Sequence, residues 1–586
     1  MALMTDRWIA DTLASERYPI YTRANAGEVM PDPVSPLTSS FGIAGPGEQG
    51  WRDAYVRGGT MDHDEFEPDR PDCVGIFGGY LYLNLSLIRL YGVRMPGMTP
   101  ELADVQYLGD MPGITPYADE ARPTDESERH SALMTAWIGE LFTRTSLDEL
   151  AADRDEVDRW VARRPVLEET TDQELVDQAR SFIPLYRRLF CRHIMTSGAT
   201  GIGLGVLGQV LGAIGRPELA MVLVAGLGEV DSAAPSFALW ELGRLVRSSS
   251  SLTAAFDASV SGLGERLAAS AEAGDTEASE FGWRFEQFLR NFGSRGPNEW
   301  EFRSHVWGTN PALVLVAIDR MRLVADADSP TARTDTRAAE REAATAEVRA
   351  MLADNAEVLG TFDSALRLAQ LTAAGRERTK TNNIKIVHEM RLAYRELGRR
   401  WVDTGFLDNI EQIFMLTDGE MDDVVEHPER FVGVAAAREA TYLALWDVEP
   451  PFVSNGAPPD VSTWPKRSAA LLTAAAVGTV LTGIAGSPGV ATGRARIVLD
   501  PADPRGLEPG DVLISPATDP SWTPLFVTAA AVVVDVGAQI THAVIVSREL
   551  GLPCVVSVAG ATRSIPDGAL VRVDGGAGTV TVLSPA

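Results

Sequence analysis

Cysteine and positive charge are both scarce in this sequence of 586 residues. The three cysteines, Cys73, Cys191 and Cys554, lie far apart, which excludes a disulfide framework and a metal-ligand spacing. We therefore expect a reducing, cytoplasmic setting. The 52 Lys and Arg residues face 81 Asp and Glu residues, a net charge of −29. This charge argues against nucleic acid and anionic membrane surfaces as partners, so a phosphate site would need a local basic cluster.

Long uncharged runs are also rare. Residues 468–493 carry no charge and are long enough to span a bilayer. They are rich in Ala, Gly, Thr and Ser, however, and we interpret them as linker followed by a strand. The first ten residues include Asp6 and Arg7 and do not read as a signal peptide. We expect no membrane partner.

The chain is long enough for two or more domains. Residues 1 to about 120 are rich in Pro and Gly, and the aromatic run after Gly79 predicts a strand. From about 130 to 445 apolar residues recur at helical spacing, as in 331–356 and 384–402. A patch at Gly201, Gly203 and Gly205 is typical of close helix packing rather than a dinucleotide site. A Pro-rich break begins at about residue 447.

One stretch near the C-terminus has a pattern that carries chemistry. The apolar run 531–536 predicts a buried strand, and Gly537 ends it. Thr541 is a suitable N-cap for a helix that runs to about Leu550 and stops at Gly551. His542 then lies in the first helical turn, where a negative group on its ring would meet backbone N–H groups and the positive end of the helix dipole. The alternative is an ordinary surface histidine.

The sequence motifs around His542 favour a phosphoryl-carrying histidine over an ordinary surface histidine. The sequence contains, in order, GSPGVATG (486–493), TDPSWTPLF (518–526), THA (541–543) and SRELGLP (547–553). This order resembles the mobile phosphohistidine domain of the phosphoenolpyruvate-utilising enzymes. The resemblance covers roughly 480–586 and implies that His542 accepts the phosphoryl group and that Thr541 positions its ring. Two departures are Ala538, where the family commonly has a second Gly, and Thr541, where it has Ser.

The strongest basic cluster in the chain spans residues 376–380, in the order Arg-Glu-Arg-Thr-Lys. On a helix Arg376 and Lys380 share a face, and together they suit the charge of a phosphoryl group in transfer. The alternative is a solvated helical face with ordinary salt bridges.

Further words resemble the central, substrate-binding domain of rifampin phosphotransferase-like proteins. They are NAGE (25–28), SPLT (35–38), FGG (77–79) and FLRNFGSRGP (288–297). The resemblance implies that Arg376 and Lys380 lie near the phosphohistidine at the acceptor, and that Glu377 orients them or takes a proton. We also predict substrate-binding roles for five residues: Arg378, Arg295, Glu299, His305 and Trp307. For His305 and Trp307, and for Trp283, Trp300 and Phe302, packing in a core is the alternative.

Together these features predict a multidomain chain. A large, mainly α-helical substrate domain with a strand-containing N-terminal part spans 1–446, a linker spans 447–479, and a small α/β swivelling phosphohistidine domain spans 480–586. No Walker-type loop or ATP-grasp domain is apparent. We therefore expect a phosphotransferase component whose His542 is phosphorylated from ATP, with Mg²⁺, by a separate ATP-grasp protein. Its acceptor would be a hydroxyl or carboxylate of a small organic molecule, and no metal ligands are predicted in this chain.

Two other functions remain open from the sequence. The phosphorylated acceptor could lose phosphate, which would make the net reaction a dehydration or condensation with the same phosphohistidine. A non-catalytic small-molecule-binding relative is the other possibility.

Overall fold

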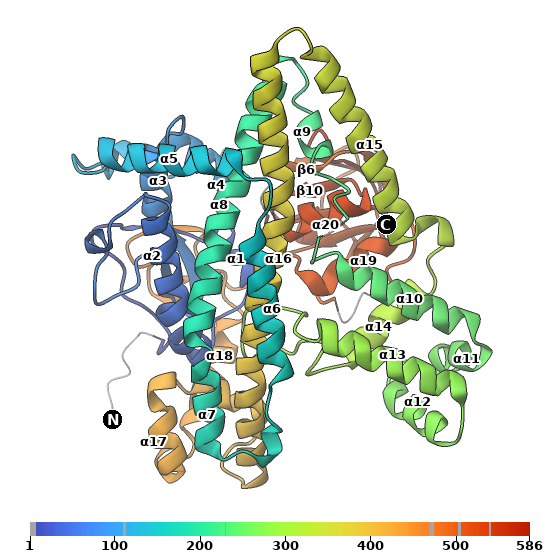
Figure 1. The fold of residues 1–586 in the computed structure, drawn as a ribbon. Helices are drawn as coiled ribbons and strands as arrows, with labels where there is room; N and C mark the ends of the chain where they lie inside the picture. Colours follow the sequence, from blue (N-terminus) through green and yellow to red (C-terminus); the bar gives the residue numbers. More distant parts are fainter. Residues whose placement is uncertain (1–7, 109–112, 229, 468–473, 502–505, 538–540) are drawn as a thin grey trace. The chain divides into compact units, whose positions relative to one another are not determined.

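The computed structural model describes residues 8–108, 113–228, 230–467, 474–501, 506–537 and 541–586 (Figure 1). Contacts within the chain divide it into two compact units. Unit 1 comprises Met1–Ile202, Trp300–Ser304 and Arg378–Ala470. Unit 2 comprises Gly203–Glu299, His305–Glu377 and Leu471–Ala586. The ranges 1–446 and 447–479 each contribute to both units, and the domain limits given above stay a prediction.

Unit 1 contains a four-stranded antiparallel sheet in the order β2-β3-β1-β4. A tight turn joins β2 to β3, with Gly78 and Gly79 at φ 54° and 80° and Phe77 opposite Tyr80, as a two-residue hairpin requires. The strand predicted after Gly79 is therefore confirmed as β3. The strands are β1 (Ile20–Thr22), β2 (Val74–Phe77), β3 (Tyr80–Asn84) and β4 (Val453–Asn455).

β4 lies in the Pro-rich stretch that we predicted as a linker. It pairs with β1, with Ile20 opposite Asn455. Part of this stretch is thus built into the sheet of unit 1.

Helices make up most of the rest of unit 1. The segment η1 (Thr38–Gly47) is a π-helix that contains Pro46. The α-helices are α1 (Ala26–Val29), α2 (Glu48–Arg57), α3 (Leu85–Arg94), α4 (Pro100–Leu108), α5 (Glu128–Thr143), α6 (Asp148–Ala162), α7 (Asp172–Ser181), α17 (Met421–Glu426) and α18 (Val434–Leu445). The 3₁₀ helices are η2 (His63–Glu65), η3 (Tyr117–Asp119), η4 (Leu167–Glu169), η6 (Ile410–Met415), η7 (Asp418–Glu420), η8 (Pro428–Phe431) and η9 (Val461–Thr463).

Two long helices, α8 (Ile183–Ala213) and α16 (Ala356–Asp403), contribute residues to both units. The packing predicted for the Gly-rich patch is confirmed at Gly203 of α8. A Cβ there would meet the backbone nitrogen of Ala369 on α16 at 2.9 Å. Apart from neighbouring backbone of the same helix, no heavy atom of the described residues lies within 4 Å of a Cβ built on Gly201 or Gly205.

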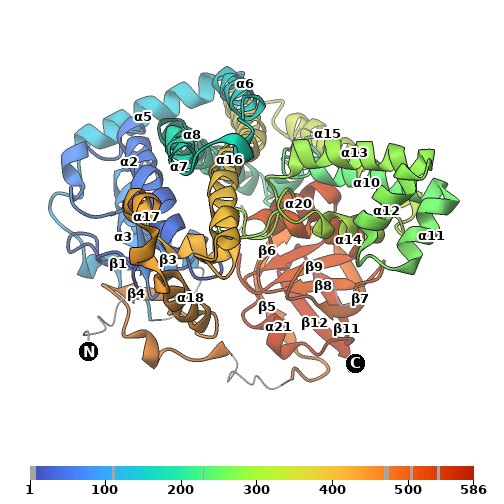
Figure 2. The ribbon, with the colours of Figure 1, turned by 90° about the horizontal axis from the view of Figure 1, so that it is seen from below.

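Unit 2 contains an eight-stranded sheet in the order β5-β12-β11-β7-β8-β9-β10-β6. Its centre, β7 to β10, is parallel, whereas the remaining pairs are antiparallel. Figure 2 shows β7, β8 and β9 side by side. The strands are β5 (Val480–Thr482), β6 (Ile484–Ser487), β7 (Val490–Ile497), β8 (Val512–Ser515), β9 (Ala531–Val534), β10 (Cys554–Val556), β11 (Leu570–Asp574) and β12 (Thr579–Ser584).

Four helices of unit 2, α10 to α13, pack together and precede the sheet in sequence. The α-helices that lie wholly in unit 2 are α9 (Leu219–Val222), α10 (Ala234–Ser248), α11 (Ser250–Ala258), α12 (Leu263–Glu272), α13 (Thr276–Phe292), α14 (Ala312–Met321), α15 (Pro330–Met351), α19 (Thr523–Thr528), α20 (His542–Leu550) and α21 (Ala561–Ser564). Two 3₁₀ helices are η5 (Asp326–Asp328) and η11 (Pro520–Trp522).

One buried apolar cluster joins these helices to the sheet. Leu239 of α10 and Ile318 of α14 share it with Phe526 of α19 and Val532 of β9. The helices therefore cover one face of the sheet, and burial of this shared apolar surface stabilises unit 2. The mainly helical chain, with strands near its start and an α/β arrangement at its end, confirms the predicted fold class.

One helical run, Asp172–Ala213, is long and apolar enough to cross a membrane, with a hydropathy of 1.4. Its most apolar window is 44% buried within the protein. Core helices have the same character, so this is weak evidence for a membrane span. The uncharged stretch noted above spans residues 468–493, and its first six residues, 468–473, lie outside the described residues.

Candidate active site

His542 begins α20, directly after the strand–loop segment that follows β9. Thr541 is the N-cap residue, and Gly551 ends the helix in the left-handed conformation at φ 66°. The predicted strand, the helix start after Thr541 and the glycine stop are thus confirmed. Residues 538–540, including the Ala538 departure, lie outside the described residues.

Two threonine hydroxyls contact the ring of His542. Thr523 Oγ1 lies 3.2 Å from Nε2, and Thr518 Oγ1 lies 3.3 Å from Nδ1. The histidine is only 6% exposed, and its ring also packs near Phe526 with a centroid separation of 5.8 Å. Both ring nitrogens therefore meet hydroxyl partners in a buried setting, which holds the plane of the ring, and each hydroxyl can donate to a ring lone pair or accept from a ring N–H.

The sheet explains why these residues meet. β8 and β9 are parallel neighbours, with Leu513 opposite Val532. The loop after β8 carries Thr518, and the loop after β9 leads to His542. Loops at the carboxyl ends of adjacent parallel strands converge at one edge, which is where α/β sheets commonly bind ligands.

Thr541 is buried, but its side chain does not cap α20. Its Oγ1 is buried and has no hydrogen-bond partner among the described residues. The N–H groups of the first turn have no acceptor within the helix, so they and this hydroxyl are suited to an anion on the histidine ring. The positioning role of Thr541 stays a prediction.

The residue after Thr518 ties this loop to the segment that follows α13. Asp519 Oδ2 accepts from the backbone N–H of Asn298 at 2.8 Å, and Oδ1 accepts from Ser521 N at 2.9 Å. Burial raises the pKa of Asp519 to about 6. Two predicted substrate residues, Arg295 and Glu299, lie in the same segment. They form a buried ion pair, with Nε 2.9 Å from Oε2, which indicates a structural role.

The basic cluster lies on α16. Arg376 Nη1 donates to Glu377 Oε1 at 2.6 Å, and Ser232 Oγ donates to Glu377 Oε2. Glu377 is 2% exposed and Arg376 only partly exposed. Because both carboxylate oxygens of Glu377 already accept hydrogen bonds, this residue is suited to orienting Arg376.

Two further ionisable side chains project from α20. Burial lowers the pKa of Arg548 to about 10, the charge of Glu549 opposes this shift, and the charge of Arg376 adds to it. Burial raises the pKa of Glu549 to about 7, and its Oε2 accepts from Leu227 N at 3.0 Å. The charge of Arg376 thus acts on Arg548, an interaction that the sequence did not predict.

The remaining predicted residues fall into different settings. Lys380 and Arg378 are half-buried on α16, and Lys380 follows Arg376 by one helical turn. His305 is exposed, whereas Trp307 is 1% exposed in the core against Phe288. The packing alternative therefore describes Trp307 better than a substrate contact.

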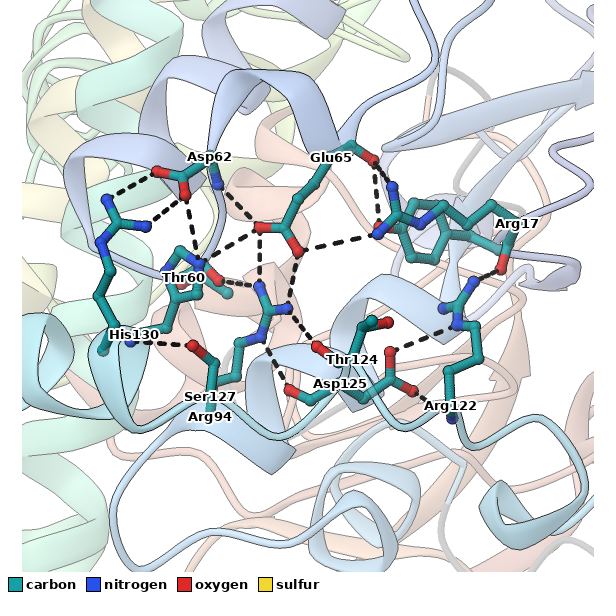
Figure 3. Close-up of polar contacts among 12 residues, drawn as sticks. Arg17, Thr60, Asp62, Glu65, Arg94, Arg122, Thr124, Asp125, Ser127 and His130 are labelled. Atoms are coloured by element: carbon teal, nitrogen blue, oxygen red, sulfur yellow. Dashed lines mark hydrogen bonds and ion pairs between the residues drawn. The ribbon is translucent and has the colours of Figure 1, made fainter.

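One cluster in unit 1 has the composition of a metal site (Figure 3). Among the described residues, ligand atoms of Asp62, Glu65 and His130 lie within 4.8 Å of one another. However, Glu65 accepts from Arg94 at 2.7 and 3.0 Å, and Asp62 accepts from Arg129 at 3.1 Å. These guanidinium groups already supply the positive charge, so the cluster is an ion-pair network and does not fit Mg²⁺.

Sequence reasoning missed Thr518, Thr523, Ser232, Arg548 and Glu549 as parts of this environment. Thr518 and Thr523 lie in the motif 518–526, and Arg548 and Glu549 lie in the motif 547–553. Both motifs contributed to the resemblance, but the spacing of these residues in the sequence did not predict a role for them. Ser232 had no signal at all, because its contact with Glu377 spans 145 residues.

Comparisons with known proteins agree with this geometry. Residues 193–377 match the rifampicin phosphotransferase fourth domain, and residues 507–578 match the mobile domain of PEP-utilising enzymes. These ranges contain Arg376, Glu377 and His542.

Individual relatives cover different parts of the chain. An uncharacterised protein of Mycobacterium tuberculosis is 28% identical over 596 residues, covering 98% of this chain and 62% of that protein. The rifampicin phosphotransferase of Streptomyces sviceus is 38% identical over 189 residues, covering 32% and 21%. The chondramide synthase of Chondromyces crocatus is 36% identical over 246 residues, covering 39% and 6%. This chain thus spans less than two thirds of each relative.

The buried histidine at the start of α20 and the arginine–glutamate pair on α16 each fall within one of the two matched ranges. The chain therefore contains one region that matches the mobile domain of the PEP-utilising enzymes and another that matches the fourth domain of the rifampicin phosphotransferases.

Proposed function

We propose that this protein is a phosphotransferase component that carries a phosphoryl group on His542. The group comes from ATP bound by a separate ATP-grasp protein and passes to a hydroxyl or carboxylate of a small organic acceptor. The observation that supports this most strongly is the setting of His542. It is a buried imidazole at a helix N-terminus, with both ring nitrogens on threonine hydroxyls, in a segment that matches the mobile domain.

In the loading step one ring nitrogen of His542 is the nucleophile. A covalent carrier divides one difficult transfer into two easier ones. Thr518 and Thr523 hold the ring, and the hydroxyl that accepts its N–H proton leaves the other nitrogen with its lone pair. The first-turn N–H groups of α20 and the Thr541 hydroxyl then suit the oxygens of the bound phosphoryl group.

In the transfer step Arg376 and Lys380 stabilise the charge on the moving phosphoryl group. Guanidinium binds phosphate oxygens in pairs, and ammonium acts as a mobile point charge. Glu377, fixed by Ser232, holds the Arg376 guanidinium in place, which reduces the reorganisation needed when the group arrives.

ATP and Mg²⁺ belong on the partner protein in this proposal. Mg²⁺ prefers carboxylate and phosphate oxygens with water, and the one candidate cluster among the described residues is occupied by arginines. The proposal includes no nucleic-acid or membrane partner and a cytoplasmic setting, and the net charge of −29 and the three separate cysteines support these expectations.

The test is the intact mass of the protein after incubation with ATP and Mg²⁺, alone and with a candidate ATP-grasp protein, under mildly alkaline conditions. We expect a gain of one phosphoryl group only with the partner, and none in His542→Ala. A gain without the partner would place the nucleotide site on this chain. No gain with an active partner would leave a small-molecule-binding protein, whose ligand affinity His542→Ala should preserve.

A dehydration or condensation is a second candidate, favoured by the similarity of 246 residues to a relative named chondramide synthase. It would use the same phosphohistidine and release inorganic phosphate after the acceptor is phosphorylated. Product analysis separates the two: a stable phosphorylated acceptor supports the phosphotransferase, and free phosphate with a dehydrated or joined product supports the second candidate.

A further inference from the structure

A histidine in unit 1 lies within a cluster of aromatic side chains. His193 of α8 is half-buried, with ring centroids 6.3 Å from Phe190 and 6.1 Å from Trp300. Phe190 and Trp300 meet edge to face at 5.9 Å, and Trp51 of α2 lies 5.8 Å from Phe190. We call Trp51, Phe190, His193 and Trp300 the aromatic cluster. Such a surface favours an aromatic or other flat apolar molecule.

The imidazole of His193 is held by a residue of α16. Its Nδ1 lies 3.0 Å from Thr379 Oγ1, and Thr379 is 2% exposed. Thr379 directly precedes Lys380, which carries a predicted role in phosphoryl transfer. When Nδ1 donates to Thr379, Nε2 holds the lone pair and has the tautomer of a general base.

Trp300 supplies a second, independent observation. Its indole Nε1 is buried and has no hydrogen-bond partner among the described residues. A buried donor without an acceptor is unfavourable, so most such groups in native proteins have a partner. An acceptor oxygen on a bound molecule would satisfy this N–H.

We propose that the aromatic cluster is the acceptor site of the phosphotransferase and that His193 is its general base. The acceptor class is an aromatic compound with a hydroxyl group, whose ring packs on Phe190 and Trp300. This proposal rests on the proposed function, because it names the substrate class and proton acceptor for the second half-reaction.

The step balances without a further reagent. The hydroxyl proton of the acceptor moves to His193 Nε2 while its oxygen forms a bond to phosphorus. The P–N bond to His542 breaks, and its electron pair returns to the histidine ring. The products are an aryl phosphate, a neutral His542 and a protonated His193, which then loses its proton to solvent.

The first experiment measures binding alone, with 2-naphthol as the probe and its fluorescence as the signal. We expect saturable binding to the unphosphorylated protein. Trp300→Phe keeps the aromatic packing but lacks the N–H, so binding should weaken by about 2- to 10-fold. Trp283→Phe is the matched control, because Trp283 is 61% exposed, and it should bind like the wild type. Absence of saturable binding, or wild-type affinity in Trp300→Phe, would overturn the proposed site.

The second experiment measures transfer. The protein is phosphorylated chemically with phosphoramidate, loading at His542 is verified by peptide mapping, and formation of 2-naphthyl phosphate is followed. We expect His193→Gln to load normally but to transfer about 10²- to 10⁴-fold more slowly, as loss of a general base predicts. Thr379→Val should also slow transfer, and Thr379→Ser should restore it.

The two proposals fail in distinguishable ways. If wild-type His542 does not become phosphorylated, the proposed function fails, whereas the binding assay still tests the aromatic cluster. If His542 loads and His193→Gln transfers at the wild-type rate, the assignment of His193 is wrong and the carrier role of His542 stands.

Discussion

Removal of the two threonine hydroxyls tests whether they prepare His542 for phosphorylation. Thr518 and Thr523 are 3% and 0% exposed, and valine has nearly the same shape as threonine. Thr518→Val and Thr523→Val therefore remove a hydroxyl each without opening a cavity. The structure predicts that both variants keep their fold and lose control over the orientation and tautomer of the ring.

The magnitude follows from the two contacts. At 3.2 and 3.3 Å they lie at the long end of hydrogen-bond distances, so each is worth about 0.5–1 kcal/mol in the resting state. The ring gains positive charge as it attacks phosphorus, and a hydrogen bond from a charged donor is worth about 1.5–3 kcal/mol. We therefore expect at least about 10-fold slower loading when the threonine that accepts from the N–H is replaced. Replacement of the threonine that donates to the lone pair should change loading by less than about twofold, because that hydrogen bond must break before the nitrogen attacks.

The assay follows the phosphorylation of His542 by phosphoramidate, with intact mass and peptide mapping as readouts, so it needs no partner protein. Thr518→Ser and Thr523→Ser keep the hydroxyl and should load at nearly the wild-type rate. Thr528→Val is the matched control: Thr528 is 4% exposed, and its Oγ1 has no hydrogen-bond partner among the described residues. The larger effect identifies the nitrogen that retains its proton.

The result that would refute this reasoning is loading within about twofold of the wild type in both valine variants. Equal slowing in Thr528→Val would also refute it, because the effect would then come from general changes in packing. Since both hydroxyls act on one ring, we expect the double variant to be less affected than the sum of the two single effects.

Three further predictions concern stability. Burial raises the pKa of Glu549 from 4.5 to about 7, so its stabilising contribution is present below about pH 4.5 and is lost as pH rises through 7. Glu549→Gln should therefore gain up to about 3 kcal/mol over the wild type between about pH 5 and pH 8, measured by urea unfolding, and a pH-independent difference would contradict this. Gly203→Ala should lose about 1–3 kcal/mol because its Cβ meets backbone at 2.9 Å, whereas Gly205→Ala, with no atom within 4 Å, should gain up to about 1 kcal/mol; equal thermal midpoints would count against this packing. Arg94→Met leaves Glu65 without its bidentate partner and should cost about 3–5 kcal/mol in urea unfolding; a near-neutral effect would show that the network contributes little.

Local signals predicted much of the fold because they depend on neighbouring residues. The strand before His542 and the glycine stop at 551 were predicted correctly, because an apolar β-branched run and a chain reversal have specific residue requirements. Thr541 occupies the predicted N-cap position, but its side chain does not make the capping hydrogen bond. The hairpin at Gly78 and Gly79 was predicted only in part. The sequence predicted the strand that follows these glycines, β3. It did not predict that β3 pairs with β1 and that β1 pairs with β4, because these pairings join distant parts of the chain.

The site residues divide in the same way. His542 and the pair Arg376 and Glu377 were predicted as site residues from the sequence, because their residue types and the motifs around them carry the signal. The contacts of Glu377 with Ser232 and of Asp519 with Asn298 were not, because each joins segments more than 140 residues apart. Trp307 illustrates the reverse case: an aromatic residue near functional motifs was assigned to a substrate but lies in the core.

The contact between the mobile domain and the helices before it combines opposing contributions. A shared apolar cluster, including Ile318 and Phe526, favours the contact. Asp519 and Glu549 oppose it at neutral pH, because burial raises their pKa to about 6 and about 7. The backbone N–H that each carboxylate accepts across the contact offsets only part of this cost. A carboxyl group whose pKa rises on contact binds a proton more tightly there, so the contact is strongest at low pH and weakens as pH rises through 6 and 7. The proposed function requires His542 to move between two sites, and such movement needs a contact of limited strength. Two buried carboxylates provide that limit without disturbing the apolar packing.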